Sequence, residues 1–176
     1  MRVITGSARG RKLQTLEGRD VRPTTDKVKE ALFSIIQFEI EGRRVLDMFA
    51  GSGQLGIEAL SRGAKNATFI DASKRAVEII KANIKATGFE NVARVVNNDS
   101  VLEVKTSLET YDLAFLDPPY STGLIQKALP VVAESMAQGG IIICETPSGE
   151  ELPENVGDFK LNKIYKYGKT WLQLYR

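Results

Sequence analysis

Short apolar runs alternate with longer amphipathic segments along most of the chain. Five runs, each closely followed by polar or glycine residues, lie at residues 45–49, 67–70, 92–96, 113–116 and 141–144. Runs of this length predict buried strands. Between them, apolar residues recur at helical spacing, as at Val77, Ile80 and Ile84 before Gly88. Strands that alternate with helices predict βαβ units and a mainly parallel sheet.

The segment before the first run has a different pattern. Residues 1–20 contain two strand-like stretches with a glycine-containing turn between them, which predicts a small hairpin. Apolar residues at helical spacing over residues 28–36 predict a helix. Thr24, Thr25 or Asp26 can supply the side-chain oxygen that caps its first turn.

The predicted elements also have expected interruptions and ends. Gly42 should end the first helix or the turn after it. A later helix over residues 124–136 contains Pro130, which should kink or split it because proline removes a backbone donor. Residues 159–167 and 170–175 are strand-like and separated by only two residues, so they predict a closing antiparallel hairpin.

Composition is that of an ordinary globular protein. The 176 residues are 43% hydrophobic and 26% charged, which fits one domain with a substantial core. We expect residues 1–41 to form a basic extension and residues 42–176 the main domain, within one compact unit. No apolar run approaches the roughly 20 residues of a membrane span, and the N-terminus lacks the apolar region of a signal peptide. We therefore predict a cytoplasmic protein without a membrane partner.

Cysteine and histidine content excludes several kinds of chemistry. The single cysteine, Cys144, lies in an apolar run, where it is expected to be a small buried hydrophobe and not a nucleophile. The chain contains no histidine, which excludes Ser-His and Cys-His hydrolysis and every His-ligated metal centre. We predict no metal, and any proton transfer must involve carboxylates, tyrosines, lysines or water.

Positive charge is concentrated at the N-terminus. Residues 1–30 contain eight Lys/Arg and four Asp/Glu, a net charge of +4, whereas the remainder has 16 and 18, a net charge of −2. A basic segment on a nearly neutral body is typical of proteins that bind a polyanion such as nucleic acid. Simple solvation of the surface would explain four charges equally well.

The most informative motif is Asp117-Pro118-Pro119-Tyr120. It directly follows a predicted buried strand, and proline cannot continue a central ladder, so the strand ends there. Ligands of open α/β sheets bind at this carboxyl edge. Asp117 and the Pro118 carbonyl are two acceptors for an exocyclic amine, and Tyr120 offers an aromatic face for a planar ring. A strand followed by a proline-rich turn is the structural alternative.

A second motif, Gly51-Ser52-Gly53-Gln54-Leu55-Gly56, follows the first strand. It matches the dinucleotide fingerprint G-x-G-x-x-G, and Asp71 lies about twenty residues further on, where an acid can bond ribose hydroxyls. The glycines allow the backbone to approach a ligand closely. This pattern alone indicates an adenosine-containing ligand, either NAD or S-adenosylmethionine.

Three features favour S-adenosylmethionine. Asp47 lies four residues before Gly51, where a carboxylate can hold the ammonium of a methionine moiety but would be poorly placed beside a pyrophosphate. Asn98, Asp99 and Ser100 follow the third strand, where an acid can accept from an adenine amine. The closing antiparallel pair is unlike an ordinary dinucleotide fold. Capping of helices or turns is the alternative role for Asp71 and Asp99.

These motifs resemble the bacterial RsmD family of 16S ribosomal RNA guanine-N2 methyltransferases. The resemblance covers almost the whole chain. It includes the segments Met1-Arg-Val-Ile-Thr-Gly, Arg9-Gly-Arg-Lys-Leu, Arg22-Pro-Thr-Thr-Asp, Val45-Leu-Asp-Met-Phe-Ala-Gly-Ser-Gly and Phe115-Leu-Asp-Pro-Pro-Tyr. The glycine loop and Asp-Pro-Pro-Tyr are common to many amino-group methyltransferases. The Arg-Pro-Thr-Thr-Asp segment and the basic opening are more specific to this family.

The resemblance implies a fold, a cofactor and site residues. The fold is a Rossmann-like S-adenosylmethionine-dependent methyltransferase fold, a seven-stranded, mainly parallel sheet with a C-terminal antiparallel hairpin and an N-terminal hairpin-helix extension. The predicted catalytic residues are Asp117, Pro118, Pro119 and Tyr120. The predicted cofactor-binding residues are Asp47, Phe49, Gly51, Ser52, Gly53, Asp71, Asn98, Asp99 and Ser100. The predicted RNA-binding residues are Arg9, Arg11, Lys12, Arg22 and Thr24.

The implied reaction is direct transfer of a methyl group to the N2 amine of one guanine in 16S rRNA, in a small ribosomal subunit or an assembly intermediate. A DNA adenine or cytosine amino-methyltransferase shares Asp-Pro-Pro-Tyr, although the chain has little room for a target-recognition domain. A protein-glutamine methyltransferase would call for Asn at position 117, and a cytosine-C5 enzyme for a catalytic cysteine. A dehydrogenase and a non-catalytic RNA-binding assembly factor are the remaining alternatives.

Overall fold

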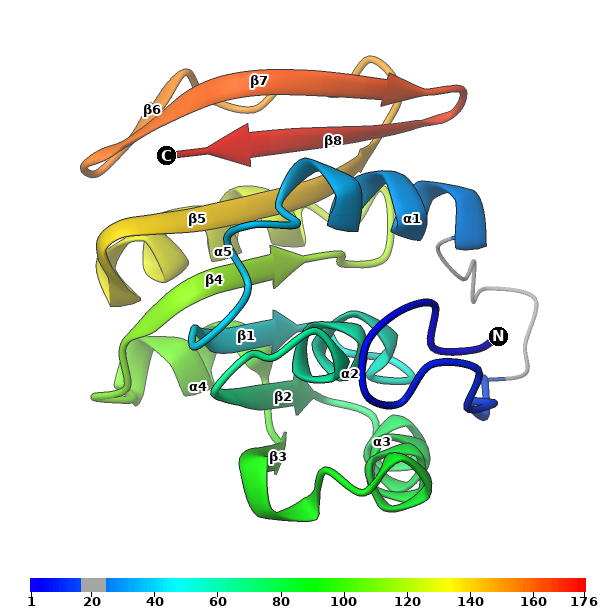
Figure 1. Cartoon of the computed structure of the whole chain (residues 1–176). Helices are drawn as coiled ribbons and strands as arrows, with labels where there is room; N and C mark the ends of the chain where they lie inside the picture. Colours follow the sequence, from blue (N-terminus) through cyan, green and yellow to red (C-terminus); the bar gives the residue numbers. More distant parts are fainter. Residues whose placement is uncertain (17–24) are drawn as a thin grey trace.

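An eight-stranded sheet crosses the described part of the chain, residues 1–16 and 25–176 of this computed structural model. Its strand order is β3-β2-β1-β4-β5-β8-β7-β6 (Figure 1). The parallel strands are β1 (Arg44–Met48), β2 (Asn66–Asp71), β3 (Ala93–Asn97), β4 (Tyr111–Leu116) and β5 (Met136–Pro147). The antiparallel strands are β6 (Asn155–Val156), β7 (Phe159–Tyr167) and β8 (Thr170–Tyr175).

Helices cover both faces of this sheet. They are α1 (Asp26–Ile35), α2 (Gln54–Ser61), α3 (Lys74–Thr87), a 3-10 turn η1 (Glu90–Val92), α4 (Ser100–Thr106) and α5 (Leu124–Ser135). Along β4, Leu113 and Phe115 join the apolar cluster formed with α1, α2 and α3, whereas Ala114 and Leu116 join the cluster formed with α4 and α5. Burial on both faces explains why the central strands β1, β2 and β4 are nearly continuous apolar runs, whereas the edge strand β3 is only half-buried.

The predicted fold class and C-terminal hairpin are confirmed, with two differences in the strands. The sheet has an eighth strand, β6, because two residues pair with the start of β7. Strand β5 begins at Met136 and not at Ile141, and it includes Gly139 and Gly140. An irregularity in the pairing with β4, between Tyr111 and Leu113, accommodates the extra residues. A glycine pair therefore marked an irregular strand and not the loop before one.

The predicted N-terminal hairpin is present but very short: the Val3 N–H donates to the Arg11 carbonyl and the Leu13 N–H to the Met1 carbonyl, each at 3.0 Å. Residues 1–14 do double back, but Arg2 and Lys12 form one isolated antiparallel bridge and no strand is present there. The backbone N–H groups of Ile4 and Thr5 instead donate to the Glu58 carboxylate on α2, at 2.8 and 3.0 Å. These donors are used against the main body, so they cannot extend a ladder.

Of the expected interruptions, the split at Pro130 is absent, and Gly42 ends the turn after α1 and not the helix itself. Helix α5 runs continuously through Pro130, so proline does not split it. Only one backbone donor is missing, and the buried Ala128, Leu129 and Val132 hold the helix against the sheet. Helix α1 ends at Ile35, well before Gly42, which has a φ of 74° in the turn that leads to β1. Thr25, one of the three candidate caps, accepts the N–H of Val28 at 3.3 Å.

The carboxyl ends of the parallel strands are aligned at one edge. Met48 lies opposite Ile70 on β2 and opposite Leu116 on β4, and Asp71 lies opposite Asn97 on β3. Neighbouring strands are about 4.8 Å apart. The residues that follow β1, β2, β3 and β4 therefore lie close together, and this edge is where the predicted site residues are concentrated.

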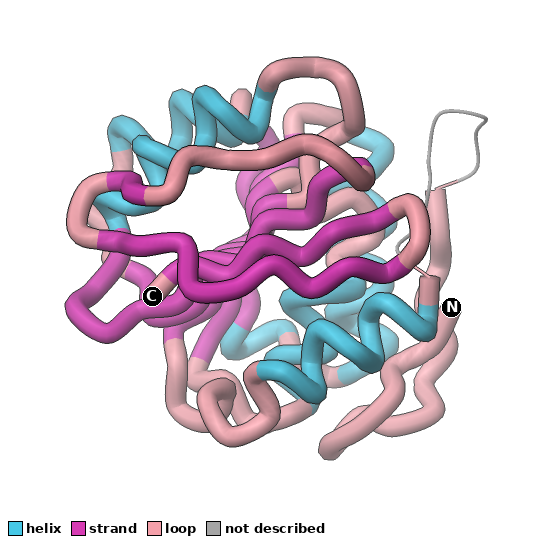
Figure 2. Tube along the Cα trace, turned by 90° about the horizontal axis from the view of Figure 1, so that it is seen from above, coloured by secondary structure: helices cyan, strands magenta, loops and turns pink. Residues whose placement is uncertain are grey.

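Figures 1 and 2 show the N-terminal segment and the turn between β7 and β8 at the same end of the molecule as this edge.

Among the described residues, none of the helices combines the length and the apolar character that crossing a bilayer requires.

Helix α2 packs against β2 through a glycine, which leads to a first prediction. A Cβ on Gly56 would lie 2.3 Å from Cε1 of the buried Phe69 ring. In most helix interiors Gly→Ala is favourable by about 1 kcal/mol. Here we expect Gly56→Ala to lower the free energy of unfolding by about 1–3 kcal/mol, as overpacking does. Urea unfolding of the variant and the parent measures this difference in free energy.

Phe69→Leu in the Gly56→Ala background provides the control, because a smaller side chain should recover part of the loss. A Gly56→Ala protein that is as stable as the parent would show that the contact with the ring imposes no constraint.

Candidate active site

The turn between β1 and α2 has an unusual backbone conformation. Phe49, Gly51 and Gly53 have φ values of 69°, 57° and 76°. A left-handed conformation costs glycine little, but it is strained for a bulky residue such as Phe49. Such strain is concentrated at ligand sites, where the surrounding structure enforces it. Among the described residues, a Cβ added to Gly51 would meet Leu16 alone, at 3.9 Å, so none of them crowds the Gly51 backbone on that side.

Asp71, at the end of β2, is bound to this turn. One carboxylate oxygen accepts the N–H of Gly51 at 2.8 Å, and the other accepts the N–H of Ser73 at 2.8 Å. The Asn97 amide donates to the carbonyls of Asp71 and Ala72, at 3.0 Å each. The acid that sequence analysis assigned to ribose thus lies beside the glycine turn, with its orientation fixed by both neighbours.

Asp47 lies in the interior below the turn. Its side chain is 2% exposed, and Oδ2 accepts the N–H of Gly56 at 2.8 Å. Burial raises the pKa of Asp47 to about 7, with a smaller contribution from the charge of Asp71 and against the effect of the Gly56 hydrogen bond. A buried carboxylate that is costly to ionise is well suited to receive a cationic group.

The residues after β3 are organised mainly by capping. Asp99 accepts the N–H of Leu102 at 2.8 Å and caps α4. Asn98 donates to Glu103 at 3.0 Å and accepts the N–H of Asp99 at 2.9 Å. Ser100 is buried, whereas Asp99 is exposed. The structural alternative considered for Asp99 is therefore present, and contact with adenine stays a prediction.

The Asp-Pro-Pro-Tyr segment continues directly from β4. Asp117 is half-buried, Pro118 is buried and Pro119 is exposed. The Tyr120 hydroxyl donates to Oε1 of Glu145 at 3.1 Å, and it lies 3.4 Å from Oγ1 of Thr170. Burial, with smaller contributions from the charges of Glu145 and Asp117, raises the pKa of Tyr120 to about 12. The hydroxyl therefore stays protonated, and its contacts hold the aromatic ring in a fixed position.

Cys144 has the structural role that its sequence context predicts. It is fully buried on β5, and burial raises the pKa of its thiol. A thiol that resists ionisation is a poor nucleophile, which excludes a role like that of the cytosine-C5 enzymes.

The N-terminal segment is attached to α2 and α3 close to the glycine turn. Asn83 on α3 donates to the carbonyls of both Gln14 and Ser52, at 3.0 and 2.9 Å. Ser52 also places its hydroxyl 3.8 Å from the Met1 sulfur. The basic side chains of Arg9, Arg11 and Lys12 are exposed. The other two predicted RNA-binding residues, Arg22 and Thr24, lie outside the described residues.

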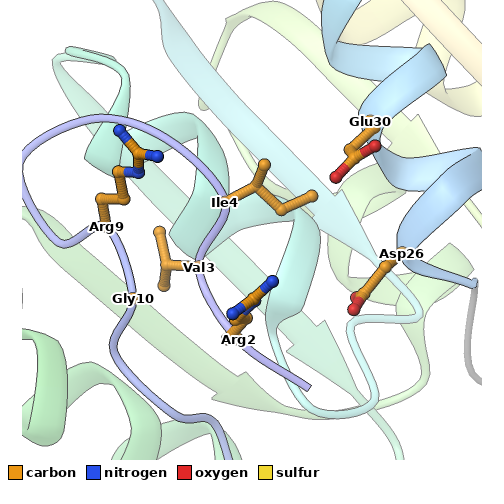
Figure 3. A pocket seen from close by; sticks show the side chains of 7 residues that line it. All are labelled: Arg2, Val3, Ile4, Arg9, Gly10, Asp26 and Glu30. Carbon is orange, nitrogen blue, oxygen red and sulfur yellow. The ribbon is translucent and has the colours of Figure 1, made fainter.

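A cavity of about 210 Å³ separates this segment from α1. Arg2 and Arg9 lie on one side of it and Asp26 and Glu30 on the other (Figure 3). Neither the glycine turn nor Asp-Pro-Pro-Tyr lines it, so it is a gap between two charged surfaces and not the candidate site.

Comparison with known proteins identifies the family. A family model described as "Conserved hypothetical protein 95" matches residues 1–176. The chain is 41% identical over 181 residues to YlbH of Bacillus subtilis (strain 168), provisionally named an rRNA methyltransferase, covering 100% of this chain and 98% of that protein. It is 38% identical over 162 residues to ribosomal RNA small subunit methyltransferase D of Haemophilus influenzae, covering 88% and 84%. The chain belongs to the RsmD family.

A solved structure agrees with this assignment. The structure of yhhF from Escherichia coli, provisionally named a methyltransferase, has a TM-score of 0.87 and 34% identity and covers 99% of this chain and 96% of that one. The RsmD family resemblance seen in the sequence is thus confirmed over the whole chain, together with the fold.

Several residues that organise this RsmD-family site were not found from the sequence. Glu145 and Thr170 fix the Tyr120 hydroxyl, while Asn83 and Glu58 attach the N-terminal segment. The sequence does contain a signal for two of these residues, Asn83 and Glu58. Asn83 lies between Ile80 and Ile84 on the apolar face of a helix, and Glu58 interrupts an otherwise apolar helix. A polar residue on a buried face must have a partner, and here the partner is the N-terminal segment.

Proposed function

We propose that this chain is an S-adenosylmethionine-dependent rRNA methyltransferase that modifies the N2 amine of a guanine in 16S rRNA. One observation carries the proposal: in an RsmD-family chain, the glycine turn and Asp-Pro-Pro-Tyr follow directly from β1 and β4, which are neighbours in register. The small ribosomal subunit or an assembly intermediate is the proposed substrate, and the bacterial cytoplasm the proposed location.

The residues around the glycine turn fit the cofactor. Asp47 supplies a buried carboxylate for the ammonium, Asp71 an acceptor for ribose hydroxyls, and Gly51 a backbone that no described side chain crowds. Phe49, Ser52, Gly53 and Asn98 to Ser100 complete the proposed binding surface. When bound, S-adenosylmethionine supplies an electrophilic methyl group on a sulfonium.

The target guanine is held by the segment after β4. Asp117 and the Pro118 carbonyl accept from the N2 amine, whose lone pair is delocalised into the ring, and so favour the positive charge that develops on nitrogen. The Tyr120 ring stacks on the base, which contributes about 1–3 kcal/mol to holding it unstacked. Because Tyr120 stays protonated, the proton released from nitrogen passes to Asp117 or to water.

The proposal is tested by tritiated methyl transfer from S-adenosylmethionine to small ribosomal subunits, naked 16S rRNA and duplex DNA. We expect transfer to the first or second substrate and none to DNA, with N2-methylguanosine as the labelled nucleoside in mass spectrometry. Label on adenine or cytosine of DNA would instead support the amino-methyltransferase alternative. Subunit binding without any transfer would support an assembly factor.

The basic N-terminal residues give a second prediction. Replacing Arg9, Arg11 and Lys12 with Ala should weaken rRNA binding. It should also reduce the salt slope, the slope of log K against log salt concentration, by about 2–3, because fewer counterions are released on binding when phosphate contacts are lost. Filter binding at several salt concentrations measures the slope. The same substitutions at the exposed Lys65, Lys85 and Lys105, which lie at the opposite edge of the sheet, are the control. Equal slopes for both variants would remove the segment from the RNA interface.

A further inference from the structure

The hairpin of β7 and β8 has an unbalanced charge. Residues 159–176 contain five basic side chains and no Asp or Glu. Lys160 pairs with Glu154 at 3.4 Å, and Arg176 pairs with Glu39 at 2.7 Å. The other three, here called the hairpin lysines, are Lys163, Lys166 and Lys169. They are exposed, and within residues 1–16 and 25–176 they form no ion pair.

Aromatic rings alternate with these lysines. The Lys163 ammonium lies 4.9 Å from the centroid of the Tyr165 ring. The Lys166 ammonium lies 4.3 Å from the centroid of the Trp171 ring, its register partner on β8. Positive charge for phosphates combined with rings for bases is the usual composition of a surface that binds single-stranded nucleic acid.

The end of the hairpin also lies at the edge of the sheet that holds the candidate site. Strand β7 is antiparallel to β8, which is antiparallel to β5, so β7 ends at the carboxyl edge that holds the candidate site. Thr170, between Lys169 and Trp171 in the chain, lies 3.4 Å from the Tyr120 hydroxyl. The N-terminal basic segment lies at the same end of the molecule, on the side of α2 and α3 (Figure 1).

We propose that the hairpin lysines, with Tyr165 and Trp171, form a second rRNA-binding surface, which contacts the phosphates next to the target guanine. Because side chains alternate along a strand, this surface wraps around the end of the hairpin, with Lys163 and Tyr165 on one face and Lys166 and Trp171 on the other. The inference rests on the proposed function and extends it: the rRNA is held on both sides of the site, by the N-terminal segment and by the hairpin. Lysines also deter pairing at an open sheet edge, and among the described residues no strand pairs with the outer side of β7 beyond Leu161. That role alone predicts no effect on RNA binding.

The test compares Lys163, Lys166 and Lys169→Gln with Lys65, Lys85 and Lys105→Gln, which removes three exposed lysines at the opposite edge. Binding of transcribed 16S rRNA is measured from 50 to 200 mM salt, and thermal unfolding confirms that both variants are folded. We expect the hairpin variant to lose about 2–3 from the salt slope and to bind roughly tenfold more weakly at low salt, with the control unchanged. Trp171, the single tryptophan, reports contact through its fluorescence.

Each outcome decides between the two claims. Equal salt slopes for the hairpin and control variants, in a protein that transfers methyl groups to rRNA, would overturn the hairpin surface and leave the function intact. A reduced slope for the hairpin variant, in a protein that transfers no methyl group, would support the surface and overturn the proposed reaction. Tryptophan emission unaffected by saturating rRNA would also count against the hairpin.

Discussion

Replacing Asp117 with Ala will nearly abolish methyl transfer and leave S-adenosylmethionine binding largely intact. Asp117 follows β4, one strand away from the glycine turn, and its proposed role is to accept from the guanine amine as positive charge develops. Loss of one such preorganised hydrogen-bond partner typically lowers kcat by about 10²–10³. Single-turnover transfer to rRNA gives the rate, and calorimetry with S-adenosylmethionine gives the affinity.

Asp158→Ala is a matched control, because Asp158 is exposed in the turn between β6 and β7, at the opposite edge of the sheet. It should change neither quantity. Asp117→Asn retains an acceptor oxygen and should retain more activity than Asp117→Ala. If Asp117→Ala weakened cofactor binding as strongly as it slowed transfer, Asp117 would belong to the cofactor site and not to the base site.

Replacing Asp47 with Asn will stabilise the free protein at neutral pH and weaken cofactor binding. The carboxylate is 2% exposed, and its pKa is raised to about 7, from near 4 in the unfolded chain. The folded protein therefore holds this proton more tightly than the unfolded chain does. Below about pH 4, Asp47 is protonated in both the folded and the unfolded state, so its titration does not change the free energy of unfolding. As pH rises to about 7, stability falls by about 4 kcal/mol in total.

Asparagine removes this loss, because it cannot ionise while its oxygen still accepts from Gly56. Urea unfolding should show Asp47→Asn equal to the parent near pH 4 and increasingly more stable up to pH 8. Affinity for S-adenosylmethionine at pH 8 should fall about 10- to 100-fold, through loss of a charged hydrogen bond. Asp158→Asn should show neither effect. A parallel pH dependence of stability in Asp47→Asn and parent would mean that Asp47 does not titrate in this window.

The parallel core of the fold was predictable from local patterns. Strands β1, β2 and β4 and the second half of β5 are mostly buried apolar runs, and β3 is a half-buried one at the edge. Gly168 and Lys169 leave no room for anything but a hairpin between β7 and β8. The position of the site followed from one rule, that carboxyl ends of parallel strands meet at one edge. Asp47, Gly51, Asp71 and Asp117 are candidates because each lies at or just after such an end.

What the sequence did not predict depends on long-range contacts. The N-terminal backbone donors could complete a ladder or bind a carboxylate, and only the position of Glu58 on α2 decides between them. Glu145 on β5 and Thr170 on β8 both contact the Tyr120 hydroxyl, and no local pattern reveals that these residues lie beside it. Pro130 is tolerated because burial of its neighbours outweighs one missing backbone bond. The role proposed for the hairpin lysines has no local signal either, because it depends on which edge of the sheet they reach.

The most direct measurement is a crystal structure with a bisubstrate analogue in which the N2 atom of guanine is covalently linked to the adenosyl moiety of the cofactor. The expected structure has the ribose at Asp71, the guanine edge within hydrogen-bond distance of Asp117 and its ring against Tyr120. An analogue whose adenosine occupies the glycine turn while its guanine lies away from Asp117 would contradict the account. So would an adenosine bound away from the turn altogether.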